Sequence, residues 1–463
     1  MNRSSVRCQP LPHLWLLAAA VGCAIALPVQ ADSVTDWNAV ASSPTVLPRF
    51  GGPQQQYRAM AIVQIAVHDA LNSISPRFQR YTTVSPAGAG ASPDAAVAAA
   101  TRTTLLGMIG ALPPAPTPVE ATNRANAIVA INAAFDAAIG PGAPDATEAL
   151  GIAAGDAAAN AMLALRYVDN GGVWSPIDGS GTPNSPPYAL AAGLGIHQPT
   201  PAPEFPAVTL PAFTGWPFVR TFAVNSASQF RAPPGQIFDI GGARYASEYG
   251  QVKHQGDARV RGAFPNSHHS DVARFWPGGG LEWNANARLI AASRSLDRWQ
   301  HARLFALMNM SVADSMITNL ESKYHYNFWR PVTAIRWADD GNPATVSDPN
   351  WRPFLQTPPY PDYPCASTSV TGAAAQTLRR FFGTNALRFT RTVTAPPVPL
   401  PAPMTELPAK VITRHYGSMS IAENEQARAR VYAGIHFIEG CHAGIRSGNQ
   451  VANWVFARQL RPL

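Results

Sequence analysis

Apolar positions recur with helical periodicity along most of this chain. Residues 58–72, RAMAIVQIAVHDALN, show the pattern most clearly and predict a buried helix. His68 and Asp69 lie inside it, where we interpret them as internally satisfied polar residues, with a catalytic role as the less favoured alternative. Similar patterns predict helices at 94–112, 118–139, 145–168, 244–253, 270–276, 284–313 (continuing to Lys323), 332–337, 364–382 and 420–460. The chain is therefore predicted to be all-α, a helical bundle with long Pro/Gly-rich loops.

Stretches without helical periodicity separate these helices. Residues 32–57 are polar and rich in Pro and Gly, and we expect an extended lead-in there. Residues 169–236 are rich in Pro, Gly and Ser; a loop this long either caps a site or links domains, and we favour the cap. Residues 385–408 are another Pro-rich stretch. We expect a single domain over 58–463, made of N-terminal helices at 58–168, a loop-rich cap at 169–236 and site-carrying helices at 237–463.

The N-terminus has the pattern of an export signal. Arg3 and Arg7 precede an apolar run over residues 14–27, and Val29-Gln30-Ala31 is typical of a cleavage site. The run is too short for a membrane-spanning helix, and no later stretch is apolar enough to cross a bilayer. We therefore expect residues 1–31 to be a signal peptide and the mature protein to be exported, either periplasmic or secreted.

The amount and distribution of charge indicate which kinds of binding partner to expect. The net charge is +7 and the sequence pI about 9.4, but only 14% of residues are charged. The basic residues are scattered and form no Lys/Arg block, so a nucleic-acid partner is not expected. An excess of cations in a chain with so few charges is compatible with a small anionic ligand, although it also fits general solubility.

Cysteine is rare in the mature chain. Cys8 and Cys23 fall in the predicted signal peptide, which leaves Cys365 and Cys441. In an oxidising compartment an even pair is typical of one disulfide, and two buried free thiols are the alternative.

Residues 323–331, KYHYNFWRP, carry the first candidate chemistry. If the stretch is helical, the seven-residue spacing puts Lys323 and Arg330 on one face, about 10 Å apart along the axis. Two cations on one face without acids at i±4 suit a tetrahedral oxyanion. A solvated amphipathic helix with two incidental cations is the equally weighted alternative.

Two later segments add to this pattern. The small residues Cys365, Ala366 and Ser367 follow Pro364 at a predicted helix start, where backbone N–H groups can bind an anion. Taken alone, that segment fits an ordinary helix N-terminus better. Arg430 is followed six residues later by His436.

Together, these three segments resemble the vanadium-dependent haloperoxidase / type-2 phosphatidic acid phosphatase superfamily. The flanking text, including KYHYNFWRPVTAIRWADDGNP and WRPFLQTPPYPDYP, resembles its soluble bacterial haloperoxidase-like branch. The resemblance runs over residues 58–460, and the three-part pattern with its spacing is far more specific than any one part.

The resemblance implies an all-helical bundle whose centre holds one oxyanion, vanadate or phosphate. By position, Lys323, Arg330 and Arg430 would bind its oxygens, and His436 would attach to it directly. Tyr360 lies where an aromatic residue would border a halide pocket, with a packing role equally weighted. The implied partners are hydrogen peroxide, a halide and a small organic substrate, and the alanine-rich N-terminal half offers a face for a homodimer.

The middle segment departs from the family pattern, which is Pro-Ser-Gly-His. Here Cys365 stands at the serine position, Ala366 at the glycine position and Ser367 at the position of the acid–base histidine. A hydroxyl group cannot exchange protons near neutral pH as an imidazole does. The loss harms a phosphatase, which needs an acid for its leaving group, more than a peroxidase, whose metal activates the peroxide. The residues considered as a substitute acid are His325, His415 and His442.

Two further expectations depend on the resemblance. If both segments converge on one anion, Cys365 and Cys441 are neighbours and form the disulfide. Glu439 would orient His436 through its second ring nitrogen. The functions implied are a vanadate-dependent haloperoxidase, a soluble acid phosphatase with a phosphohistidine intermediate, or a non-catalytic oxyanion-binding homologue, and we favour the first.

Overall fold

The computed structural model describes residues 32–167, 188–189, 191–200, 211–276 and 282–463. The predicted signal peptide lies outside these described residues, as do residues 169–187, 190 and 201–210 of the predicted cap. Residues 31–463 form one compact unit. Among the helices described, none combines the length and the apolar character needed to cross a membrane.

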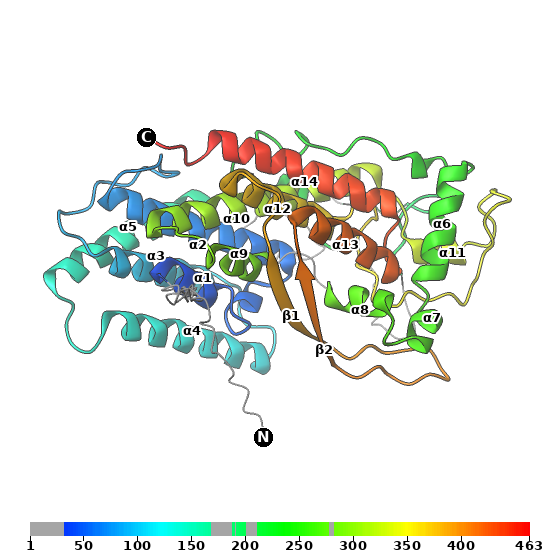
Figure 1. Cartoon of the computed structure of the whole chain (residues 1–463), viewed down its shortest axis with the longest axis horizontal. Coiled ribbons are helices and arrows are strands. Elements are labelled where there is room, and N and C mark those ends of the chain that lie inside the picture. The colour runs from blue at the N-terminus through cyan, green and yellow to red at the C-terminus, as the bar shows by residue number, and fades with distance from the viewer. Residues whose placement is uncertain (1–31, 168–187, 190, 201–210, 277–281) are drawn as a thin grey trace, which may run out of the picture. The chain divides into compact units, whose positions relative to one another are not determined.

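Most helices of the N-terminal half pack on α2 (Figure 1). α2 (Pro53–Ile74) is buried along most of its length and contacts α3, α5 and α10. This burial explains why its sequence is apolar on more than one face. The other helices of this half are α1 (Ser33–Ala41), α3 (Pro93–Gly110), α4 (Pro118–Ile139) and α5 (Ala146–Tyr167).

The expected extended lead-in over 32–57 is wrong, because this stretch contains α1 and the first residues of α2. Asp32 caps α1 by accepting a hydrogen bond from the Thr35 backbone N–H at 3.1 Å, and Trp37 buries its side chain in the core. Pro53 starts α2, since the first helical position needs no N–H donor. The Pro and polar residues therefore begin helices here.

The single helix expected from residue 284 to Lys323 is two helices. α9 (Trp283–Ala291) ends, and α10 (Arg298–Tyr326) begins again after a capping box. Asp297 accepts the Gln300 backbone N–H at 3.0 Å, and the Gln300 side chain accepts the Asp297 N–H at 2.9 Å. α10 is buried on nearly all sides and contacts α2, α12 and α14, so it forms the centre of the bundle.

Two C-terminal helices pack very closely against each other. α12 (Ala366–Phe382) lies beside α14 (Ile438–Arg458), as Figure 1 shows. Gly444 and Gly448 of α14 face the first turns of α12, where any Cβ would collide with the carbonyl oxygens of Cys365 and Ser369. The glycines thus let the start of α12 approach α14 at backbone distance.

Shorter elements complete the described fold around this pair. They are η1 (Leu47–Phe50), η2 (Trp216–Phe218), η3 (Gln236–Phe238), α6 (Ala243–Gln255), α7 (Ala258–Ala263), α8 (His268–Phe275), α11 (Pro331–Arg336) and α13 (Met419–Tyr432).

The fold is mostly helical, as predicted, but the Pro-rich stretch over 385–408 contains a strand. β1 (Phe389–Ala395) pairs antiparallel with β2 (Lys410–Tyr416), with Phe389 opposite Tyr416. Thr and Val alternate in β1 and its ends are buried, the pattern of a half-buried strand. The prolines lie in the connection between the strands, where no ladder hydrogen bond is lost.

Candidate oxyanion site

Lys323 and Arg330 come together, but a shared helix face is not the reason. α10 ends at Tyr326, and Asn327 takes a left-handed conformation with φ 50°. Arg330 then stands just before α11. The chain turns between the two cations, and both lie over the ring of Tyr360, at 5.2 Å for Lys323 Nζ and 5.1 Å for the Arg330 guanidinium carbon.

Both cations are fully buried. Lys323 Nζ donates to the backbone oxygens of Pro361 and Asp362, each at 2.7 Å. Arg330 donates through Nε to the Tyr360 oxygen and through Nη1 to the Ile435 oxygen, each at 2.8 Å. Its Nη2 has no hydrogen-bond partner among the residues that the structure describes.

The positive charges of Lys323 and Arg330 are buried without full compensation. Burial, and then the charge of Arg330, hold the pKa of Lys323 well below its usual range. Burial also lowers the pKa of Arg330, against the opposing effect of Asp362. Two desolvated cations with an unpartnered guanidinium nitrogen form a site that an anion would stabilise.

Asp362 and His436 form a buried pair beside Arg330. His436 Nδ1 lies 2.7 Å from Asp362 Oδ1, and Arg330 Nη1 lies 2.9 Å from His436 Nε2 and 3.6 Å from Asp362 Oδ1. The nearby carboxylate favours the tautomer of His436 that carries its proton on Nδ1. The lone pair is then on Nε2, which is the nitrogen that can attach to an oxyanion centre.

Asp362 was missed by sequence reasoning, which suggested Glu439 as the partner of His436. Glu439 instead accepts the backbone N–H groups of Gln236 and Ile237, at 2.9 and 3.0 Å, and so anchors η3. The available signal was an acid two residues before Pro364, in the segment already expected to converge on His436. The expected role of Glu439 is corrected accordingly.

The start of α12 supplies backbone donors. Cys365 is the N-cap residue, and no side chain caps this helix. The first intrahelical bond runs from Ser369 N–H to the Cys365 oxygen, so the N–H groups of Ala366, Ser367 and Thr368 precede the helical ladder. An uncapped and largely buried helix start of this kind is a suitable place for an oxyanion.

The two cysteines are buried neighbours, as the resemblance implied, but both are free thiols in this structure. Burial raises the pKa of the Cys365 thiol, yet hydrogen bonds with Cys441 and His436 and the charge of Arg430 outweigh it, and the net pKa is well below its usual range. The disulfide between these neighbouring thiols is not formed in this structure and stays a prediction for protein from an oxidising compartment.

Arg430 is the third cation of the site. It lies in the last turn of α13, is buried, and donates from Nη1 to the Trp276 oxygen at 2.8 Å. Its charge acts on Cys365 and on Arg330, which puts it in the same cluster. Lys323, Arg330, Arg430, His436 and the Cys365–Ser367 helix start thus converge in the described structure.

Two of the three histidines considered as a substitute acid lie away from this cluster. His325 is exposed, and its Nε2 lies 3.4 Å from Arg231 Nη1. His415 is exposed in β2 and contacts the Thr390 hydroxyl at 2.8 Å. His442 is half-buried, and burial followed by the charge of Arg446 lowers its pKa.

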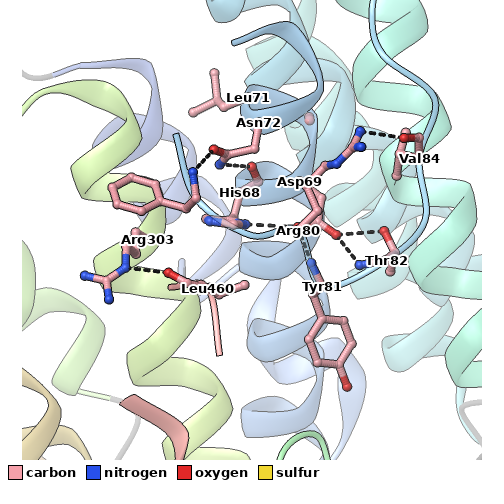
Figure 2. Close-up of polar contacts among 12 residues, drawn as sticks. His68, Asp69, Leu71, Asn72, Arg80, Tyr81, Thr82, Val84, Arg303 and Leu460 are labelled. Carbon is pink, nitrogen blue, oxygen red and sulfur yellow. Dashed lines mark hydrogen bonds and ion pairs between the residues drawn. The ribbon is translucent and has the colours of Figure 1, made fainter. Parts of the chain in front are cut away.

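The buried pair His68–Asp69 is a structural element, as the sequence favoured. Figure 2 shows Asp69 pointing from α2 to the neighbouring loop. It accepts the Tyr81 N–H at 2.9 Å, the Thr82 N–H at 2.6 Å and the Thr82 hydroxyl at 2.7 Å, while His68 Nδ1 contacts Asp69 Oδ1 at 2.9 Å. The pair fastens this loop to the bundle.

Comparison with known proteins connects this geometry with one family. Residues 303–463 match the family model described as the VCPO second helical-bundle domain. The vanadium chloroperoxidase of Curvularia inaequalis is 27% identical over 179 residues, which are 32% of this chain and 29% of that protein. The match therefore spans less than a third of the curated relative.

Solved structures share the fold over nearly the whole chain. A bacterial vanadium-dependent iodoperoxidase has a TM-score of 0.70 at 20% identity, covering 93% of this chain and 97% of its own. The holo form of a bacterial vanadium-dependent chloroperoxidase has a TM-score of 0.65 at 16% identity, covering 92% and 97%. The fold is that of the vanadium haloperoxidases.

The family match covers the helices that carry the site, from α10 to the C-terminus. With the curated relative and the shared fold, it confirms the resemblance in the sequence. Residues 303–463 are thus similar in sequence to the vanadium haloperoxidases, and the described chain shares their fold.

Proposed function

We propose that this chain is a vanadate-dependent haloperoxidase-like enzyme. In the proposed reaction, hydrogen peroxide, a halide ion and a proton give hypohalous acid and water, and a small organic molecule takes up the halogen. The observation that carries the proposal is the buried His436, held by Asp362 at 2.7 Å inside a cluster of three cations. When bound, vanadate supplies the Lewis acid that activates peroxide.

The residues present fit such a group. His436 offers the Nε2 lone pair, because its other ring nitrogen contacts Asp362. Arg330 offers the unpartnered Nη2, and the first-turn N–H groups of α12 add neutral donors. Arg330 and Arg430 neutralise charge on the oxygens, with Lys323 beside them. Phosphate has the same tetrahedral shape and would compete for these donors.

In this proposal Asp362 orients the ring of His436. Its carboxylate lies beside Nδ1 and favours the tautomer whose lone pair is on Nε2. Arg330 Nη1 contacts the Nε2 side at 2.9 Å and keeps that side directed at the cluster. The chain thus prepares the ring before the oxyanion arrives, and burial excludes water from it.

Ser367 decides between peroxidase and phosphatase. A phosphatase needs an acid for its alkoxide leaving group, and the hydroxyl of Ser367 is too weak an acid. Peroxide activation at a bound metal depends less on that group, so the residue at this position favours peroxidase chemistry. Tyr360, whose ring underlies both Lys323 and Arg330, is the residue we propose to border the halide.

The test is a pair of assays on purified mature protein. Halogenation of monochlorodimedone is measured with peroxide and chloride, bromide or iodide, before and after orthovanadate is added, and p-nitrophenyl phosphate hydrolysis is measured beside it. Halogenation that requires vanadate supports the proposal. Hydrolysis without halogenation supports the phosphatase, and vanadate binding without either activity supports a non-catalytic oxyanion-binding protein.

The N-terminal segment bears on where this chemistry occurs. We propose that residues 1–31 direct export and that the mature enzyme meets peroxide and halide outside the cytoplasm.

A further inference from the structure

The oxyanion site lacks a histidine at Ser367, and the described structure contains another buried histidine close to the same cations. His197 lies in a segment that pairs with the connection between α10 and α11. Its backbone N–H donates to the Asn327 oxygen at 2.9 Å, and Ile196 forms a bridge with Phe328. This pairing fixes His197 beside the few residues that separate Lys323 from Arg330.

His197 is unusual among the buried histidines. His68, His301 and His436 each contact a carboxylate: Asp69 at 2.9 Å, Asp32 at 2.7 Å and Asp362 at 2.7 Å, respectively. The side chain of His197 is as buried, with 1% of the residue exposed, but within the described chain neither of its ring nitrogens has a hydrogen-bond partner. Leaving such a buried group without a partner is destabilising, so the arrangement calls for a ligand.

The electrostatic surroundings of His197 are those of the oxyanion site. Burial, then the charge of Arg330 and then that of Lys323 lower its pKa to about 3. The ring is therefore neutral, with one N–H to donate, and it stands within electrostatic reach of two cations that the site uses. The ring N–H can donate to an anion, and the positive charges of Lys323 and Arg330 disfavour a cationic ligand beside it.

We propose that His197 is the second histidine of the oxyanion site, and that its ring N–H donates a hydrogen bond to an oxygen of the bound oxyanion. This rests on the proposed oxyanion site and extends it. His197 then supplies from a distant loop an imidazole that the family pattern would place at Ser367. The ligand class is a tetrahedral oxyanion, vanadate or phosphate.

The primary test is calorimetric titration of the apoprotein with orthovanadate. His197→Phe keeps the ring volume but removes the donor, and we expect vanadate affinity to fall about tenfold to a hundredfold, the effect of losing a hydrogen bond to a charged group. His197→Gln retains an N–H donor, and we expect it to restore part of the affinity.

The matched control is His68→Gln, which alters a buried histidine of α2 that contacts Asp69 instead of the cationic cluster. We expect this variant to keep the wild-type vanadate affinity. Unchanged affinity in folded His197→Phe would overturn the inference.

A second measurement does not depend on how well a variant folds. Ring-15N-histidine NMR of the wild-type protein follows the His197 signal, identified by its absence from His197→Gln, while orthovanadate is added. A shift of this ring nitrogen at the same vanadate concentration that saturates calorimetry supports the contact, and an unmoved signal overturns it.

The outcomes separate this inference from the proposed function. A wild-type protein that binds neither vanadate nor phosphate overturns both. A wild-type protein that binds vanadate through His197 but oxidises no halide overturns the peroxidase proposal alone. This inference alone is overturned by an active peroxidase whose vanadate affinity does not change in His197→Phe and whose His197 signal does not move when vanadate is added.

Discussion

Two histidine–aspartate pairs in the described structure have both side chains almost completely buried, with a ring nitrogen close to a carboxylate oxygen. In α2, His68 Nδ1 is 2.9 Å from Asp69; in the connection between α13 and α14, His436 Nδ1 is 2.7 Å from Asp362. The side chains of both pairs are at most 2% exposed. The pairs differ in what surrounds the carboxylate.

Asp69 has its oxygens occupied by backbone and hydroxyl donors of one loop, so its charge is balanced locally (Figure 2). Asp362 instead faces Arg330, and its own backbone oxygen accepts from Lys323. One pair completes a network, whereas the other stands in a cationic cluster that has donors left over. A histidine–aspartate contact therefore becomes a candidate site through its unbalanced surroundings.

Removing the two histidines should separate the pairs most strongly. His436→Ala deletes the proposed attachment atom, so we expect vanadate-dependent halogenation to fall by more than about a hundredfold, beyond the effect of losing an outer contact. His68→Ala should lower the free energy of unfolding by about 1–3 kcal/mol and leave vanadate affinity unchanged. Calorimetric titration with vanadate and thermal unfolding of both variants measure these effects. An equal loss of vanadate affinity in the two variants would contradict the different roles assigned to the two histidines.

Changing the two carboxylates should give a smaller contrast. Asp362→Asn removes the acceptor that fixes the His436 tautomer, and we expect vanadate affinity to fall about tenfold to a hundredfold. Asp69→Asn should destabilise the loop that contains Tyr81 and Thr82 without changing vanadate affinity. Titrations of both variants with vanadate measure the two affinities. A wild-type vanadate affinity in Asp362→Asn would show that Asp362 does not orient the ring of His436.

Neighbouring cysteines are a second difference between the two pairs. In the described structure, thiols lie beside Asp362 and His436 but not beside Asp69 and His68. In protein recovered from an oxidising compartment, we expect Cys365 and Cys441 to form a disulfide that adds about 2–4 kcal/mol to the free energy of unfolding. Mass spectrometry after non-reducing digestion gives the linkage, and reduction before urea unfolding gives the energy. Two free thiols in exported protein would contradict this expectation.

The smallest expected effect is a change in how the free energy of unfolding depends on pH. It concerns the carboxylate of Glu248, which accepts the Glu439 N–H at 2.9 Å. Burial raises the pKa of Glu248 to about 7. Because the folded-state pKa exceeds the ordinary value, its contribution to stability is complete below about pH 4.5 and is lost as pH rises through about 7. We expect Glu248→Gln to reduce the decline in unfolding free energy between these pH values; urea titrations with an unchanged slope would contradict it.

Local patterns in the sequence predicted most of the helices, because apolar spacing and caps are encoded in neighbouring residues. The order Lys323, Arg330, Arg430 and His436 likewise revealed the oxyanion cluster through its family pattern. What was missed depends on tertiary contacts. Asn327 turns the chain between two cations that the spacing alone put on one helix.

Asp362 and His197 were also missed because their positions depend on tertiary contacts. Asp362 is marked in the sequence only by its place before Pro364, and His197 has no such neighbour; each comes to the cluster through tertiary packing. The extended lead-in failed for a related reason, because Trp37 gains helix-stabilising burial only when the bundle is assembled.

The most direct measurement is a crystal structure of the mature protein soaked in orthovanadate. The account predicts vanadium attached to His436 Nε2, with its oxygens against Arg330 Nη2 and the first-turn N–H groups of α12. Vanadium bound elsewhere, or an empty cluster at saturating vanadate, would contradict it.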